Sequence, residues 1–188
     1  MDRPPTVLIL GRMNEREGYK GHAELISCWP KVVSQIPDAR LVIAGSGPGE
    51  ESIQQLAGMS PSAARIQFRG FVPEDKMDAL WEEASVFAMP SWGEGFGLVY
   101  IESMRHGVPV IASIHDAGQE INLDEETGYN VNLDHPDELT ERLIDLLKNP
   151  KRALEMGRKG QERWREHFSF SAFQGRFLPL LQGFVDAG

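Results

Sequence analysis

Two glutamates lie eight positions apart around a glycine loop in the segment EGFGLVYIE, which runs from Glu94 to Glu102. Glycines occupy positions 93, 95 and 97, and a helix is expected to begin directly after them, over residues 98–106. A glycine-rich turn at a helix N-terminus leaves backbone N–H groups free beside the positive end of the helix dipole, which suits a phosphate. Two carboxylates beside such a turn fit a diphosphate with hydroxyl groups at both ends. The spacing therefore predicts a site for a nucleotide sugar.

Each glutamate also has a simpler interpretation. Glu94 could be a solvated loop carboxylate, and Glu102 could pair with Arg105 or His106 at helical spacing. For either residue alone the simpler interpretation is favoured. The combination of the spacing, the glycines and the strand–loop–helix context favours a ligand site.

The elements that would position these residues alternate along the chain. Strands are expected at residues 6–10, 40–44, 65–69, 86–89, 110–113 and 130–133, and helices at 21–36, 51–59, 74–84, 98–106, 136–148, 151–167 and 171–185. Pro30 is expected to kink or split the first helix. This alternation predicts one Rossmann-like α/β domain with a doubly wound parallel sheet. Ligands of such sheets bind at the carboxyl ends of the strands, where the glycine loops of the first four strands lie.

Composition narrows the class of protein and of partner. The 188 residues suffice for one domain, and the formal charge of −9 argues against a nucleic-acid groove or an anionic membrane surface as the main partner. Cys28 is the single cysteine, which fits a reducing compartment and predicts a cytoplasmic location. The sequence has no zinc-ligand spacing, no signal-peptide start and no apolar run long enough to span a bilayer.

A basic cluster follows the first expected strand. It comprises Arg12, Arg16 and Lys20, with His22 beside them. The cluster could be a solvated loop neutralised by Glu15 and Glu17. Its place at a strand end favours a phosphate site instead.

Longer segments resemble a known family. PSWGEGFGLVYIESMRHGVPVIAS resembles the signature of retaining GT-B glycosyltransferases of family 4, the glycosyl transferases group 1. VLILGRM followed by YKG resembles the first strand and phosphate-binding pair of that family, and LVIAGSGPGEESIQQLA resembles its second strand, glycine turn and helix. HFSFSAFQGRF resembles the aromatic segment that closes these proteins. The loop Ala117-Gly118-Gln119-Glu120 replaces the commoner Gly-Gly-x-x-Glu loop, which in the family lies near the donor phosphates or sugar.

The resemblance implies roles for individual residues. Arg12 and Lys20 would neutralise the leaving diphosphate, and Glu94 would accept hydrogen bonds from sugar hydroxyls. Glu102 would accept from the ribose, and the backbone at 70–72 would hold the base. The expected catalytic residues are thus Glu94, Arg12 and Lys20, and the expected substrate-binding residues are Gly11, Gly70, Phe71, Val72, Gly95, Phe96, Gly97, Leu98 and Glu102. No metal and no cofactor is expected, and the donor would be a UDP- or GDP-sugar that acts as substrate.

GT-B enzymes have two Rossmann-like domains, and the resemblance covers only the C-terminal, donor-binding one. Residues 1–188 would therefore form a donor domain whose partner is an N-terminal acceptor domain absent from this chain. Any peripheral membrane contact would run through that missing domain. The last helix of the family packs on the missing half, so Phe168, Phe170, Phe173 and Phe177 are expected to expose an apolar patch. A non-catalytic nucleotide-sugar-binding module and a nucleotide-sugar epimerase remain alternatives.

Overall fold

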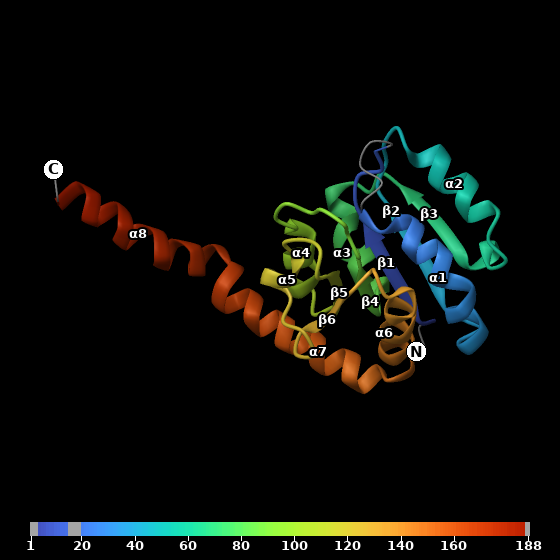
Figure 1. Cartoon of the computed structure of the whole chain (residues 1–188). Helices are drawn as coiled ribbons and strands as arrows, with labels where there is room; N and C mark the ends of the chain where they lie inside the picture. The colour runs from blue at the N-terminus through green and yellow to red at the C-terminus, as the bar shows by residue number, and fades with distance from the viewer. Residues whose placement is uncertain (1–3, 15–19, 187–188) are drawn as a thin grey trace.

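A computed structural model of the chain describes residues 4–14 and 20–186, which contain a six-stranded parallel sheet (Figure 1). The order of the strands in the sheet is β3-β2-β1-β4-β5-β6. The order reverses between β1 and β4, and such a switch point is where open α/β sheets bind ligands. The strands are β1 (Thr6–Leu10), β2 (Arg40–Ala44), β3 (Ile66–Gly70), β4 (Val86–Ala88), β5 (Val110–Ser113) and β6 (Gly128–Val131). The predicted Rossmann-like fold is confirmed.

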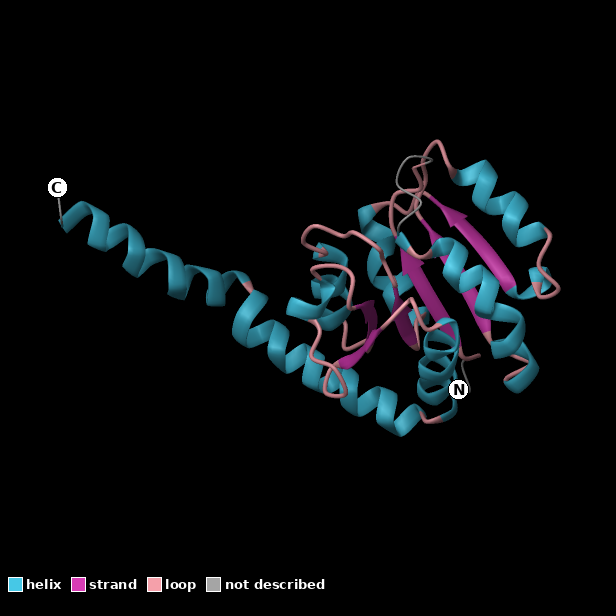
Figure 2. Cartoon of the chain, in the orientation of Figure 1, coloured by secondary structure: helices cyan, strands magenta, loops and turns pink. Residues whose placement is uncertain are grey.

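Helices cover both faces of the sheet, so the central strands read as continuous apolar runs (Figure 2). On one face α1 contacts both α2 and α6. Right-handed crossovers put α4 on the other face, where it contacts α7. The helices are α1 (His22–Gln35), α2 (Glu50–Gly58), α3 (Glu74–Glu83), α4 (Leu98–Arg105), α5 (Gly118–Ile121), α6 (Pro136–Lys148), α7 (Pro150–Arg163) and α8 (Phe170–Asp186).

The structure corrects the expected elements at four places, and the first is α5, a short helix within the segment that was expected to be a loop. Helix α1 is not split at Pro30, because Leu25, Trp29 and Val32 on both sides of the proline are buried in the core and favour one continuous helix. Strand β6 begins two residues earlier than expected, because Gly128 pairs with Val110. The single expected helix over residues 151–167 is α7 followed by a π-helical turn, Trp164–Phe168.

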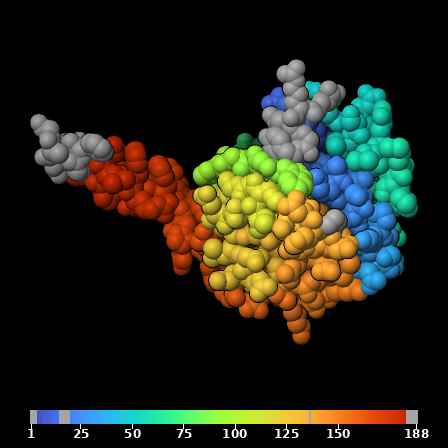
Figure 3. All heavy atoms as spheres, viewed as in Figure 1, coloured from blue at the N-terminus to red at the C-terminus, as the bar shows by residue number. Residues whose placement is uncertain are grey.

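Helix α8 projects away from the body of the domain (Figures 1 and 3). Its exposed side chains include Phe170, Phe173 and Phe177, and the rings of these three residues stack in sequence along the helix. This part of the predicted apolar patch is confirmed. Phe168 differs, because its side chain packs partly buried against the core beneath the guanidinium of Arg163.

Candidate functional site

Lys20 and Glu94 meet at the carboxyl edge of the sheet. Lys20 lies just before α1, and Glu94 lies in the loop that joins β4 to α4. The Lys20 Nζ donates a hydrogen bond to the Glu94 Oε2 at 2.8 Å, and the two side chains are only 15% and 19% exposed. Glu94 is therefore a half-buried, ion-paired residue and not a solvated loop carboxylate. Arg16 of the basic cluster, with Glu15 and Glu17, lies outside the described residues.

The surroundings of Glu94 favour its charged form. Partial burial alone raises the pKa of its carboxyl group. The hydrogen bond and charge of Lys20 oppose this effect, together with backbone hydrogen bonds from Phe96 and Gly97, and the net result is a pKa below the ordinary value. The Glu94 carboxylate thus occupies the kind of amide and cation environment that suits a phosphate.

Gly97 shapes the start of α4. It is the N-cap of the helix with φ 78°, and a Cβ atom there would lie 2.4 Å from the ring of Tyr100. That left-handed, crowded position requires glycine. The chain can therefore turn sharply into α4 directly above the buried ring of Tyr100.

Tyr100 and Asp116 brace the Glu94 loop from below. The Tyr100 hydroxyl donates to the Met89 carbonyl oxygen at 2.6 Å and lies 3.1 Å from the Asp116 Oδ2. The backbone N–H of Ala117 donates to the Glu94 carbonyl oxygen at 3.1 Å. Burial raises the pKa of the Asp116 carboxyl, although hydrogen bonds from Gly118, Tyr100 and Ser91 oppose that rise. Sequence reasoning missed both residues, and the available signal was an acidic residue in a loop at the same sheet edge.

Glu102 lies just over one turn into α4, on an exposed position of the helix. Burial raises the pKa of its carboxyl group, and the charge of Arg105 offsets only part of that rise. Within residues 4–14 and 20–186, no salt bridge joins Glu102 to Arg105 or to His106. His106 instead has its Nε2 3.5 Å from the Asp78 Oδ1. The simple helical pair considered for Glu102 is thus not formed.

These residues surround a cavity of about 400 Å³. Its lining is Leu10, Gly11, Lys20, Glu94, Phe96, Gly97, Leu98, Val99 and Glu102. Gly11 lies beneath the Lys20 stem, since a Cβ atom at Gly11 would be 3.2 Å from the Lys20 Cδ. Seven of the residues predicted from the sequence therefore line one cavity.

Five predicted residues lie outside that lining. Arg12 is exposed in the loop after β1, and Gly95 is exposed in the β4–α4 loop. Gly70, Phe71 and Val72 lie at the carboxyl end of β3, two strands away from β1. The backbone of the loop after β1 is nevertheless fixed next to Arg12, because Met13 exchanges hydrogen bonds with Ser46 and Gly49. All five remain at the carboxyl edge of the sheet.

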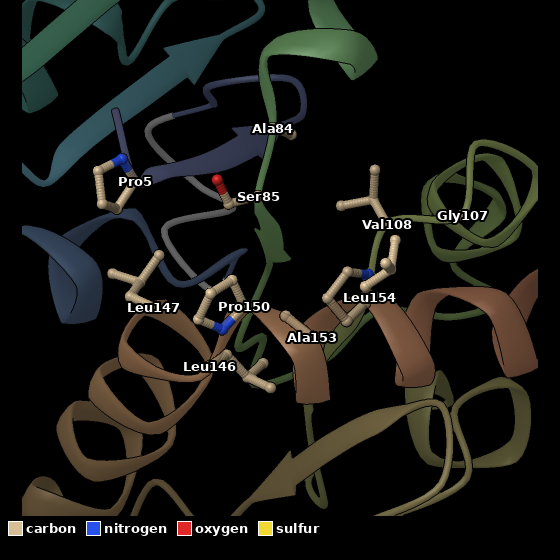
Figure 4. A pocket seen from close by; sticks show the side chains of 11 residues that line it. Pro5, Ala84, Ser85, Gly107, Val108, Leu146, Leu147, Pro150, Ala153 and Leu154 are labelled. Carbon is tan, nitrogen blue, oxygen red and sulfur yellow. The ribbon is translucent and has the colours of Figure 1, made fainter. Parts of the chain in front are cut away.

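A second hollow of about 410 Å³ lies at the opposite, amino edge of the sheet (Figure 4). Pro5, Ser85 and Pro109 line it just before β1, β4 and β5, and α6 and α7 close it from the side. Figure 4 shows mostly apolar side chains around this hollow, among them Val108, Leu146, Leu147 and Leu154. No sequence motif predicts this hollow.

Among residues 4–14 and 20–186, no group of three or more His, Cys, Asp or Glu side chains could hold a metal ion. The expectation of a metal-free site remains a prediction. Over the same described residues, every helix is too short or too polar to cross a membrane.

A sequence profile of the family described as glycosyl transferases group 1 matches residues 4–149. A GDP-mannose-dependent α-(1-6)-phosphatidylinositol monomannoside mannosyltransferase of Mycolicibacterium smegmatis is 33% identical over 186 residues, which are 95% of this chain and 48% of the relative. A phosphatidyl-myo-inositol mannosyltransferase of Mycobacterium tuberculosis is 37% identical over 77% of this chain and 38% of the relative. The chain spans about half the length of the curated relatives it matches first.

Solved structures agree with the fold. Sucrose-phosphate synthase from Thermosynechococcus elongatus superposes with a TM-score of 0.82 at 29% identity, over 98% of this chain and 46% of that one. The C-terminal domain of a glycosyl transferase group 1 family protein from Francisella tularensis superposes with a TM-score of 0.78 at 23% identity, over 88% of this chain and 87% of that one. The matched profile, the relatives and the fold agree, and the chain belongs to the glycosyl transferases group 1 family.

Proposed function

We propose that this chain is the donor-binding domain of a retaining glycosyltransferase that uses a nucleotide sugar. The observation that carries the proposal is the cavity at the β1/β4 switch point, where the Lys20–Glu94 pair lies beside the N-terminus of α4. Cations and free helix amides suit a diphosphate, and carboxylates suit sugar hydroxyls. GDP-mannose is the first donor to test, because similar mannosyltransferases are named as dependent on it.

In this proposal the positive groups act on the leaving diphosphate. Lys20, Arg12 and the N-terminal amides of α4 stabilise the charge that develops as the sugar–phosphate bond breaks. Glu94 accepts from sugar hydroxyls, Glu102 accepts from the ribose, and the backbone at 70–72 holds the base. The leaving phosphate takes the proton of the acceptor hydroxyl on the same face, which retains configuration. Basic residues and the helix dipole can do this without a metal or a cofactor.

The acceptor domain is proposed to lie in the other half of the complete protein. The chain spans about half the length of its relatives, and helix α8 carries an exposed apolar face that suits packing on another domain. Any contact with a membrane is assigned to that other half. A cytoplasmic location is part of the same proposal.

Calorimetric titration of the chain with GDP, GDP-mannose, UDP and UDP-glucose tests donor binding. We expect the wild-type chain to bind one diphosphate series. Lys20→Ala should weaken that binding by about 10- to 150-fold, because a charge-assisted hydrogen bond contributes about 1.5–3 kcal/mol. Lys31→Ala is the matched control, since Lys31 also pairs with a carboxylate, Asp137, but has a side chain that is 67% exposed. Equal losses in the two variants would contradict the site.

Activity assays separate the remaining alternatives. The chain alone should transfer no sugar, and adding a separately produced N-terminal half should restore transfer. Turnover by the chain alone would contradict the assignment of a donor half. Interconversion of a free nucleotide sugar without an acceptor would identify an epimerase. Absence of sugar transfer even after the N-terminal half is added would favour a non-catalytic binding module. Loss of nucleotide affinity in EDTA, restored by manganese, would contradict the metal-free proposal.

A further inference from the structure

A second contact lies next to the Lys20–Glu94 pair. Glu24 follows Lys20 by four residues, and Trp92 precedes Glu94 by two. The Trp92 Nε1–H donates to the Glu24 Oε1 at 2.7 Å, so the same two segments are joined twice. Trp92 therefore lies at the carboxyl edge, directly beside the proposed donor site.

The Trp92 ring is fixed and yet accessible. Its N–H group is held by Glu24, and the ring lies against the imidazole of His115 with centroids 4.6 Å apart. His115 is held in turn, since its Nε2 lies 3.1 Å from the Asn132 Oδ1 and 3.3 Å from the Leu133 backbone nitrogen. Trp92 nevertheless remains 42% exposed. A large aromatic surface held from two sides is pre-organised for a ligand.

The order of the strands indicates which part of a ligand would reach this surface. His115 follows β5 and Asn132 follows β6, on one side of the β1/β4 switch point. The proposed base site at residues 70–72 follows β3, on the other side. A nucleotide sugar whose diphosphate lies at the switch point would direct its base toward β3 and its sugar toward β5. Trp92 is therefore at the sugar end.

We propose that Trp92 is a stacking platform for a pyranose ring, an inference that rests on the proposed function. The face of an indole carries negative charge density, which attracts the weakly positive C–H groups on the flat side of a pyranose. Glu24 and Asn132 use their side-chain oxygens to hold the Trp92 and His115 rings, so the expected contribution of the platform is stacking. A nucleobase would also stack on indole, but its expected place is at β3. The pyranose is either the sugar of the donor or the sugar of the acceptor.

The test compares Trp92→Ala and Trp92→Phe with the wild-type chain. The probes are GDP, GDP-mannose, and methyl α-D-mannopyranoside added in the presence of GDP. Trp92→Ala should weaken the pyranose-bearing ligand by about three- to tenfold and leave GDP within twofold, whereas Trp92→Phe should retain most of the affinity. Phe173→Ala is the matched control, because Phe173 is an exposed aromatic residue on α8, away from the sheet edge. Loss confined to GDP-mannose identifies the donor sugar, and loss confined to the methyl mannoside identifies the acceptor sugar.

A spectroscopic readout keeps the result independent of folding and of nucleotide binding. The indole N–H resonance of Trp92, assigned by its disappearance in Trp92→Phe, should shift when methyl α-D-mannopyranoside is added. The proposed stacking role is overturned if neither GDP-mannose nor methyl α-D-mannopyranoside shifts that resonance. It is also overturned if Trp92→Ala lowers the affinity for GDP as much as the affinity for GDP-mannose. Failure of the wild-type chain to bind GDP would instead overturn the proposed function, while the methyl mannoside titration would still decide the platform.

Discussion

Two hollows of nearly equal size lie at opposite edges of the same sheet, about 400 Å³ at the carboxyl edge and about 410 Å³ at the amino edge. Strands β1 and β4 run from one to the other. Only the carboxyl-edge hollow combines an ion pair, a second carboxylate and a helix N-terminus. Volume alone therefore does not identify a site in this fold, and the direction of parallel strands decides which edge gathers the loops that can bind charge.

At the amino edge, the polar side chain that lines the hollow forms a hydrogen bond within the fold. Ser85 has the one hydroxyl side chain of that lining, and its Oγ accepts a hydrogen bond from the Thr6 N–H at 3.2 Å. The remaining lining is apolar or glycine. At the carboxyl edge the Lys20 and Glu94 side chains form a hydrogen bond with each other, and a ligand could replace either side chain as the partner of the other. The comparison predicts that changes at the two edges have different consequences.

A glycine with positive φ flanks helix α4 at each end, Gly97 at the carboxyl edge of the sheet and Gly107 at the amino edge. Substitutions of these two glycines should differ most in their effect on the free energy of unfolding. Gly97→Ala should lower the free energy of unfolding by about 2–4 kcal/mol, because it adds a clash with Tyr100 to the strain of a left-handed residue. Gly107→Ala should cost only about 1 kcal/mol, since φ is 69° there but the nearest atoms lie 3.9 Å away. Urea unfolding measures both. If Gly97→Ala lowered the free energy of unfolding no more than Gly107→Ala, the steric crowding at the N-cap would be contradicted.

A buried histidine makes the carboxyl edge sensitive to acid. Burial, with a smaller effect of Lys20, lowers the pKa of His22 to about 4. The unfolded chain takes up this proton below about pH 6.5, so the free energy of unfolding should fall by about 3 kcal/mol between pH 6.5 and pH 4. His22→Leu should flatten that dependence. At pH 7 it should stay within about 1 kcal/mol of the wild type, because the buried Nε2 has no hydrogen-bond partner among the described residues.

His106 offers the matched comparison near the amino edge. It is partly exposed and stacks on Trp81, and burial also lowers its pKa. His106→Leu should flatten the pH dependence less than His22→Leu. Unfolding titrations at several pH values measure both variants. Equal flattening of the pH dependence in His106→Leu and His22→Leu would contradict the prediction that acid sensitivity is concentrated at the carboxyl edge.

The sequence predicted the sheet and most of the cavity, because both depend on local patterns. Apolar runs ended by glycines indicate buried parallel strands, and the topology of such strands brings their ends together. Lys20 and Glu94 were predicted individually, but their ion pair depends on two loops meeting in space. Tyr100 and Asp116 were missed because a buried aromatic residue in a helix and an acid in a loop have ordinary structural explanations. The first helix was predicted, but its continuity through Pro30 was not, because tertiary packing overrode a local rule.

The two glutamates divide the carboxyl-edge cavity into separately testable parts. Glu102→Gln should weaken GDP and GDP-mannose alike, by roughly 1–3 kcal/mol, because it removes an acceptor from the ribose. Glu94→Gln should weaken only the sugar-bearing ligand. GDP itself should bind as well or better, since the change releases Lys20 from its ion pair. Calorimetry with both ligands measures this division, and weaker GDP binding in Glu94→Gln would show that the assigned roles are wrong.

The smallest effect is expected when the amino-edge hollow is filled. Ala84 lines that hollow at the end of α3, and Ala84→Leu would place three more carbon atoms in a space of about 410 Å³. Because no charged side chain and no helix N-terminus of the proposed site is touched, GDP and GDP-mannose affinities should stay within about twofold of the wild type. Titration of this variant beside Lys20→Ala provides the direct contrast between the edges. A comparable loss of nucleotide affinity in both variants would mean that the two hollows are energetically coupled through β1 and β4, and that the carboxyl edge alone does not define the site.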